Sequence, residues 1–477
     1  MGRSQSAMLK MAGLISILGL TLPLECFAAT YYIRQTIGDD ANDGLTAATA
    51  WKSLSKLTHA MKAGDTAYVG PGLYREQVNI LESGTPDQRI IFAADPTGQH
   101  TGDPPGVVMV TGADPVDESI FTPYTTPGVY TAKPGGIIEA VVEMDGDQYR
   151  YARARDTMEH LKDKLSELET VEKLPASQYF DRENGTLYIH TSDGKPPTTH
   201  EIELIRRGNG FGTWDKDFIT ISGFTFRHMG DSAISFFYGS SNVAAINNVS
   251  YGGRQGIRVY NATQVLVYGN TLFRNDNSGV YFVKEAVDGV AVGNVAYDNI
   301  KGLRWSSNSV NGIILDNVAF DNREGGISLE DANRAIVRGN ILVNNGAQLM
   351  PERSAIDSEN NCFEKKPDQL IADFVLGPKY KTLGDYQREK GMDTHSRDGN
   401  CGPLPAKVDV HKLHAETMAY AERARKILSE QAAAATATPQ ATATAMPQPT
   451  GTPMPQVTPT ATPQVTGTAS AEEAPAD

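Results

Sequence analysis

Charged and aromatic residues recur at a regular interval in the second half of this chain, within a series of short apolar segments. Two carboxylates held a fixed distance apart can hydrolyse a glycosidic bond, one as acid and the other as nucleophile or base. Arginine binds a carboxylate through paired hydrogen bonds, which suits an acidic substrate. One series contains Ser235, Arg258, Tyr281, Arg304, Ser328 and Asp357, and the other contains Phe237, Tyr260, Val283, Ser306, Glu330 and Glu359.

Hydrolysis would use the acidic end of these series. Glu330 lies one repeat before Asp357 and Glu359, and adjacent strands about 4.8 Å apart would bring these carboxylates together. Glycosidases place the two groups roughly 5 Å apart for retention and about 6.5 to 9.5 Å apart for inversion. We therefore predict Glu330, with Asp357 or Glu359, as acid and nucleophile or base. Asp331, at the strand end, is a further candidate contact.

Elimination or epimerisation of a uronate is the alternative, and it would use the basic residues. Removing the proton beside a carboxylate needs a base and a cation that stabilises the developing enolate. Arg258 and Arg304 are predicted to bind the substrate, with Tyr260 beside them, while Tyr281 or Lys284 exchanges the proton. The acidic residues could instead hold Ca²⁺ through oxygen ligands. A different class also stays open: a surface protein that binds glycan on this face without catalysis.

A repeat of 22 to 24 residues sets the interval between these side chains. Strand-sized apolar segments at a fixed period are typical of a solenoid, whose stacked turns bury one core. Because side chains alternate between the faces of a strand, the two series would point outward and the apolar residues inward. The insertion at residues 348–353 falls where the register of the last coil is decided. Asparagines mark the repeat and are expected to be structural, bonding to neighbouring coils: Asn248, Asn270, Asn294, Asn317 and Asn340.

The regular spacing is confined to part of the chain. The expected organisation is a signal peptide at 1–29, a cap with a capping helix and the first coils at 30–112, and a mixed insertion at 113–212. The main coils and an excursion follow at 213–402, then a terminal helix at 403–431 and a disordered Ala/Thr/Pro-rich tail at 432–477. The tail is interpreted as a spacer or as a glycosylated stalk.

Composition bounds the location and the partners. A charged start, an apolar run and a small-residue site before Ala29 predict a cleaved secretory signal, hence a secreted, periplasmic or surface protein without a membrane span in the mature chain. The formal net charge of −14 argues against nucleic acid as a partner. Cys362 and Cys401 would then remain as a pair and are predicted to form a disulfide. We expect a monomer.

The sequence resembles the secreted right-handed parallel β-helix proteins of the pectin-lyase-like superfamily. The resemblance rests on the Asn-marked coils and on three segments: Gly38-Asp-Asp-Ala-Asn-Asp-Gly with Trp51-Lys-Ser-Leu, Ala63-Gly-Asp-Thr-Ala-Tyr-Val, and Tyr380-Lys-Thr-Leu. It implies an all-β solenoid. The activities it implies are polysaccharide lyase, glycoside hydrolase, uronate epimerase or glycan binding. The insertion resembles one found in some β-helix glycosidases. Hydrolysis of a polysaccharide is slightly favoured over elimination.

Overall fold

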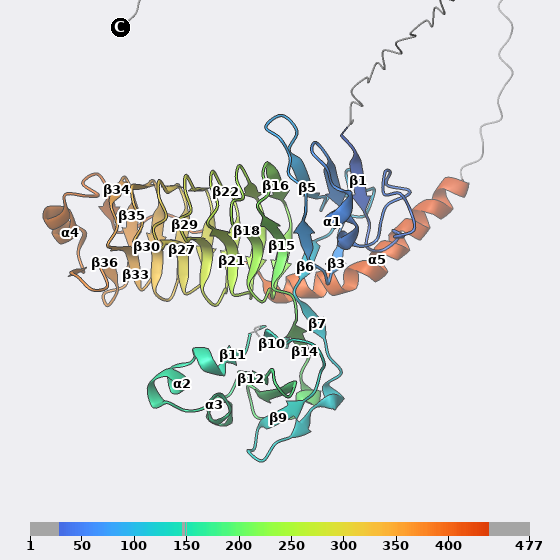
Figure 1. Cartoon of the computed structure of the whole chain (residues 1–477), viewed down its shortest axis with the longest axis horizontal. Coiled ribbons are helices and arrows are strands. Elements are labelled where there is room, and N and C mark those ends of the chain that lie inside the picture. The colour runs from blue at the N-terminus through green and yellow to red at the C-terminus, as the bar shows by residue number, and fades with distance from the viewer. Residues whose placement is uncertain (1–27, 146–147, 149, 438–477) are drawn as a thin grey trace, which may run out of the picture. The chain divides into compact units, whose positions relative to one another are not determined.

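The chain folds as a right-handed parallel β-helix, which the computed structural model describes for residues 28–145, 148 and 150–437. The predicted signal peptide, apart from its last two residues, and residues 438–477 of the predicted tail lie outside the described residues. Each coil contributes one strand to each of three long sheets, as Figure 1 shows. The predicted fold class is therefore confirmed.

The three long sheets each contain ten strands among the described residues. Sheet A consists of β1 (Thr30–Ile33), β2 (Thr66–Val69), β5 (Ile90–Ala94), β16 (Ile219–Ser222), β19 (Ala244–Ile246), β22 (Leu266–Tyr268), β25 (Val290–Val292), β28 (Ile313–Leu315), β31 (Ala335–Arg338) and β34 (Ile356–Glu359). Sheet B consists of β3 (Gly72–Tyr74), β6 (Val108–Thr111), β17 (Thr225–Arg227), β20 (Val249–Tyr251), β23 (Thr271–Phe273), β26 (Val295–Tyr297), β29 (Val318–Phe320), β32 (Ile341–Val343), β35 (Cys362–Glu364) and β38 (Arg397–Asp398). Sheet C consists of β4 (Val78–Ile80), β15 (Asn209–Trp214), β18 (Ser232–Phe237), β21 (Gln255–Tyr260), β24 (Ser278–Val283), β27 (Lys301–Ser306), β30 (Gly325–Glu330), β33 (Ala347–Glu352), β36 (Leu370–Asp373) and β37 (Lys379–Tyr380).

The core of the solenoid is built from columns of apolar side chains. Ile257, Val280, Leu303 and Ile327 occupy matching positions in four adjacent strands of sheet C, and all four are fully buried. Alternate residues of the same strands face outward, as the alternation of side chains requires. The inward and outward assignment made from the sequence is confirmed for β18 to β30.

Asparagine ladders stabilise the turns between the sheets. Asn270, between sheets A and B, donates from Nδ2 to Oδ1 of Asn294 and to the carbonyl of Ala245, both at 3.0 Å. The same pattern continues along the stack, so these buried amides are satisfied coil by coil. Their predicted structural role is confirmed. A second ladder, not predicted, lies between sheets B and C and contains Asn275, Asn299, Asn322 and Asn345.

The register of the last coil differs from the prediction. β33, which includes the supposed insertion, continues sheet C, so Met350 and Glu352 pair with Ser328 and Glu330. Asp357 and Glu359 lie instead on β34 of sheet A. The prediction fails because Gln348 occupies the position of the small residue Gly326, so β33 departs from the repeat pattern, whereas Ala355 precedes a short segment that resembles it.

The insertion forms two small sheets beside the coils (Figure 1). Glu203 joins them to the solenoid: its buried Oε1 accepts from Arg75 at 2.8 Å and from Arg227 at 3.1 Å. One sheet contains β7 (Ala113–Pro115), β10 (Ala140–Glu143) and β14 (Ile202–Ile205). The other contains β8 (Thr122–Pro123), β9 (Val129–Ala132), β11 (Ala152–Arg153), β12 (Ser177–Asp181) and β13 (Thr186–His190), with helices α2 (Met158–Asp163) and α3 (Glu167–Lys173) nearby. Single 3-10 turns lie at Glu118–Ile120, Ala154–Asp156 and Pro197–Thr199.

Helical segments and the disulfide complete the structure. The expected capping helix is short: a 3-10 turn, Leu54–Lys56, leads into α1 (Leu57–Ala60), and Leu54 and Leu57 join the core. At the other end, α4 (Leu383–Lys390) adds Leu383 and Tyr386 to the core. The predicted disulfide is confirmed, since Cys362 and Cys401 are bonded.

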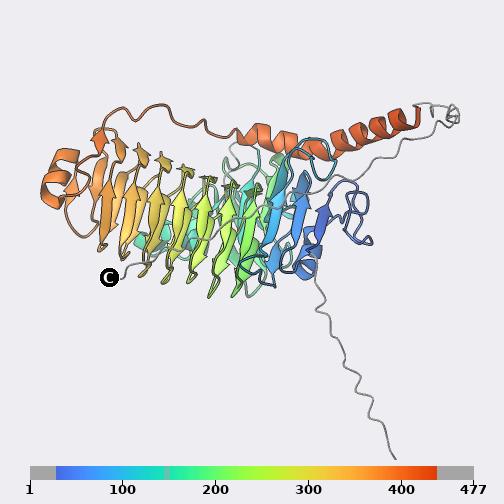
Figure 2. The ribbon, with the colours of Figure 1, turned by 90° about the horizontal axis from the view of Figure 1, so that it is seen from above.

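The segment after the disulfide returns along the outside of sheet B and ends in α5 (Val410–Ala437), as Figure 2 shows. We call residues 403–424 the strap. It covers a column of stacked rings, in which Tyr251, Phe273, Tyr297 and Phe320 have centroid separations of 4.8 to 5.1 Å. Leu404, Val408, Val410 and Leu413 of the strap pack on this column. The strap therefore closes the outer face of sheet B.

Candidate functional site

The outer face of sheet C carries the predicted basic and aromatic residues in register. Arg258, Tyr281 and Arg304 occupy matching positions on β21, β24 and β27. The Arg304 guanidinium lies 4.6 Å from the centroid of the Tyr281 ring, and the Tyr281 hydroxyl lies 3.1 Å from Oγ of Ser306. Arg258 forms an ion pair of 2.9 Å with Asp231, which immediately precedes β18. The structure thus brings these predicted residues together on one face.

Glu330 is the predicted acid that remains on this face. Its carboxylate accepts from Lys301 at 2.6 Å and from Arg304 at 2.5 Å. Burial alone would raise its pKa, but these two cations outweigh burial and hold the pKa below its usual value. Glu330 is therefore an ionised centre of an ion-pair cluster, which is unsuitable for donating a proton near neutral pH.

The other predicted acidic residues do not join this cluster. Asp357 forms an ion pair with Arg338, and both lie on sheet A. Glu359 accepts from the backbone N–H groups of Thr394 and His395. Burial would raise its pKa, yet these and the Thr394 hydroxyl lower the pKa to about 2. The register that placed Glu330 beside Asp357 and Glu359 is therefore wrong, because Glu330 lies on sheet C and the other two on sheet A. Binding of Ca²⁺ by these acids stays a prediction.

Two further predicted contacts lie in the turns that follow sheet C. Asp331 follows β30 and accepts from Arg353 at 2.7 and 2.9 Å, so its carboxylate is already paired. Lys284 follows β24 in a left-handed backbone conformation and is exposed.

Tyr260, which was also predicted to bind substrate, lies at the end of β21 and contacts Arg258, whose guanidinium lies 4.8 Å from the ring centroid.

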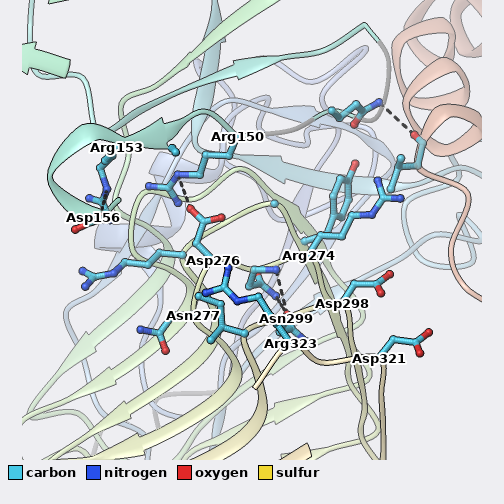
Figure 3. A pocket seen from close by; sticks show the side chains of 18 of the residues that line it. Arg150, Arg153, Asp156, Arg274, Asp276, Asn277, Asp298, Asn299, Asp321 and Arg323 are labelled. Atoms are coloured by element: carbon cyan, nitrogen blue, oxygen red, sulfur yellow. Dashed lines mark hydrogen bonds and ion pairs between the residues drawn. The ribbon is translucent and has the colours of Figure 1, made fainter. Parts of the chain in front are cut away.

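A cleft of about 730 Å³ lies where the insertion meets the turns that lead into sheet C. Figure 3 shows the charged side chains that converge on it. One wall belongs to the insertion and consists of Gln148, Arg150, Ala152, Arg153, Asp156 and Thr157. The other wall is formed by the turns before β21, β24, β27 and β30, with Val410 of the strap at one side. Arginines and aspartates from both walls line the cleft: Arg150, Arg153, Asp156, Arg254, Arg274, Asp276, Asp298, Asp321 and Arg323.

Asp276 is the most distinctive group in the cleft. Its Oδ2 lies 3.2 Å from Nε of Arg150, whose side chain is only 2% exposed, whereas 48% of the Asp276 side chain is exposed (Figure 3). Desolvation among the cleft walls raises the pKa of Asp276, although Arg150 and Arg153 partly oppose this effect. A carboxyl group with a raised pKa at the wall of a cleft is a candidate general acid.

The sequence contains one signal for Asp276 that the interpretation missed. Four residues lie between Phe273 and Ser278, whereas three lie between Tyr251 and Gln255 in the preceding coil, and these positions pair in the two sheets. The extra residue widens the turn that carries Asp276. Arg150 could not be anticipated, because it comes from the insertion and reaches the cleft only in the folded protein.

Comparisons with known proteins agree with the fold. The family model for right-handed β-helix regions matches residues 209–363, which include β15 to β32. Similar solved structures include XylC in complex with xylose, with a TM-score of 0.54 and 15% identity over 72% of this chain and 66% of that one. A lacto-N-biosidase from Eubacterium ramulus has a TM-score of 0.40 and 13% identity, over 77% of this chain and 66% of that one. A pectate lyase has a TM-score of 0.41 and 15% identity, over 80% and 89%.

These comparisons define the class of structure. The chain has a right-handed parallel β-helix fold, and it spans slightly less than two thirds of the length of XylC and of the lacto-N-biosidase. No curated protein sequence matches it. Within residues 28–145, 148 and 150–437, no helix is long and apolar enough to cross a membrane.

Proposed function

We propose that the protein is an exported enzyme that hydrolyses an acidic polysaccharide in the cleft between the insertion and sheet C. The observation that carries this proposal is the position of Asp276, whose carboxyl group lies in the cleft 3.2 Å from Arg150, where it could transfer a proton to the glycosidic oxygen as the bond breaks; its raised pKa favours the same role. Arg150 would orient this carboxyl group. The XylC structure, which has the same fold and binds xylose, supports a sugar as ligand.

A second carboxylate is available two coils away. Three adjacent strands of sheet C are immediately preceded by Asp231, Arg254 and Asn277. Two strand spacings therefore separate the backbone of Asp231 from that of Asn277, which corresponds to about 10 Å. Asp276 adjoins Asn277. Oδ2 of Asp231 accepts from Arg258, while the buried Oδ1 has no hydrogen-bond partner among the described residues. We assign Asp231 as the base that activates water, because this backbone separation of about 10 Å is nearer to the roughly 6.5 to 9.5 Å of inverting enzymes than to the roughly 5 Å of retaining ones.

The charges around the cleft favour an acidic substrate. Arg254 and Arg323 are exposed on its rim, where their planar guanidinium groups can bind carboxylates through two hydrogen bonds. The chain as a whole is acidic, with a formal net charge of −14, so this basic rim is a local feature. Export is supported by the Cys362–Cys401 disulfide, since disulfides persist in oxidising compartments.

Elimination is the second candidate, and one contact favours it. The Tyr281 ring lies against the Arg304 guanidinium, so a uronate bound by Arg304 would lie near the Tyr281 hydroxyl. That hydroxyl could exchange the proton that elimination removes. Arg304 is already bonded to Glu330, however, and a substrate carboxylate would have to compete with this ion pair.

The test is to incubate the protein with uronate-rich and neutral polysaccharides while following reducing ends and ultraviolet absorbance. Hydrolysis produces reducing ends alone, and elimination adds absorbance from the unsaturated product. We expect Asp276→Asn to lower kcat at least 100-fold, the usual contribution of a general acid. Asp357→Asn, which removes a carboxylate on sheet A, should retain activity. Binding without product, or an active Asp276→Asn variant, would refute the assignment.

A further inference from the structure

We propose that Trp214, Phe237, Tyr238 and Tyr260 form a platform that binds an uncharged sugar ring. This inference rests on the proposed polysaccharide substrate and extends it, because it implies a polymer with neutral as well as acidic units. The four rings lie at the far ends of β15, β18 and β21, where Trp214, Phe237 and Tyr260 occupy matching positions in adjacent strands. Tyr238 immediately follows Phe237.

The rings contact one another as a continuous surface. Trp214 and Phe237 have centroids 4.4 Å apart, Tyr238 and Tyr260 have centroids 4.8 Å apart, and Phe237 lies 6.1 Å from Tyr260. Phe237 is buried beneath the others, whereas Trp214 and Tyr238 are 50% and 51% exposed. A structural cluster would bury its largest rings, so two half-exposed rings on a buried base indicate a surface for ligand.

The electrostatics of the platform favour a neutral ligand. The Arg258 guanidinium lies 5.4 Å from the Phe237 ring centroid and 4.8 Å from that of Tyr260. Its charge is paired with Asp231 at 2.9 Å, so it is not available to an anionic group at the platform. A sugar ring can place its C–H face on the aromatic rings, and the hydroxyls of Tyr238 and Tyr260 can bond to the sugar hydroxyls.

The position of the platform requires an extended ligand. Three strand spacings separate β15 from β24, which corresponds to about 14 Å along the solenoid axis. The platform lies at the ends of its strands, whereas Asp276 precedes the start of β24. A single sugar therefore cannot contact both, and only an oligosaccharide or polymer can use the platform and the cleft together.

Binding is tested without relying on catalysis. The purified chain is run in native gels that contain xylan, glucomannan, arabinogalactan or glucuronoxylan, and retardation gives the affinity. We expect retardation by at least one of these polymers, and about tenfold weaker binding for Trp214→Ala and for Tyr238→Ala. Trp214→Tyr should restore much of the affinity. The matched control is Tyr268→Ala, because Tyr268 is 47% exposed on sheet A and makes no ring contact with another described residue.

Tryptophan fluorescence gives an independent readout. The chain has three tryptophans, and Trp51 and Trp305 are buried, so Trp214 should dominate any response to sugar. A blue shift with the retarding polymer, absent in Trp214→Phe, is expected. Equal retardation of wild type and both alanine variants, or no retardation by any of the four polymers, would overturn the platform. If the platform binds but Asp276→Asn remains as active as wild type, the proposed hydrolysis fails while the platform stands.

Discussion

Replacing Arg150 by methionine should raise the pKa of Asp276. Arg150 is the nearest cation, with its Nε 3.2 Å from Oδ2, and it favours the ionised carboxylate. Methionine keeps much of the arginine stem, so the buried site stays filled while the charge is lost. Desolvation already raises the pKa of Asp276, and without the Arg150 charge to counter it the pKa should rise further.

The size of the shift follows from Coulomb's law. Two unit charges 3.2 Å apart interact by about 1.3 kcal/mol at the dielectric constant of water and by about 5 kcal/mol at an effective value of 20. Because 48% of the Asp276 side chain is exposed, screening by solvent places the effect near the lower limit. About 1.4 kcal/mol corresponds to one pKa unit, so we expect an upward shift of about one unit.

The titration can be followed by carbon NMR of the side-chain carboxyl groups, with Asp276→Asn identifying the signal. If the protein cleaves a polysaccharide, the pH at which kcat/KM falls on the alkaline side should rise by the same amount, because Asp276 must be protonated to act as the general acid. Arg153→Met should give a smaller upward shift, and Arg338→Met, on sheet A, should give none. An unchanged or lowered pKa in Arg150→Met would refute the electrostatic interpretation of the cleft.

Three further predictions concern stability. Asn294→Ala should lower the free energy of unfolding by about 3 kcal/mol, since the buried amide bonds to both neighbouring coils, and calorimetry would detect the loss. Replacing Cys362 and Cys401 by serine should cost about 4 kcal/mol through the 39-residue separation, measured by denaturant unfolding. Burial would raise the pKa of Glu203, but His228, Arg227 and Arg75 lower it to about 2. Its contribution to stability should therefore persist above about pH 4.3 and decline as pH falls toward 2, so thermal melts should show a smaller loss of stability over this range in Glu203→Gln than in the wild type.

The fold could be predicted because its determinants are local and repeated. Each coil carries the same asparagine, small residue and alternating strand, and stacking turns this sequence period into columns such as Ile257 and Val280. The face shared by Arg258, Tyr281 and Arg304 followed from the same period. The last coil was predicted wrongly because Gln348 replaces the small residue that Gly326 provides in the coil before, so the local pattern points to the segment after Ala355 and not to β33.

The cleft could not be predicted, because it depends on contacts between distant segments. Arg150 meets Asp276 only because Glu203 and its arginine partners fix the insertion beside the coils. The platform was only partly anticipated, through Phe237 and Tyr260. Trp214 belongs to the first strand after the insertion, β15, which lies before the asparagine-marked coils from which the series were aligned.

The strap has a consequence for how the protein unfolds. A solenoid whose coils contact only their neighbours can fray from either end, one coil at a time. Here Lys407 binds Asp298 and Asp321 in the later coils, while the Tyr420 hydroxyl donates to the carbonyl of Pro104 in an early one. The strap therefore links the coils around Asp298 and Asp321 to the early coil around Pro104, so these coils cannot separate without releasing it. The coils should melt together in one cooperative transition, despite their repetitive construction.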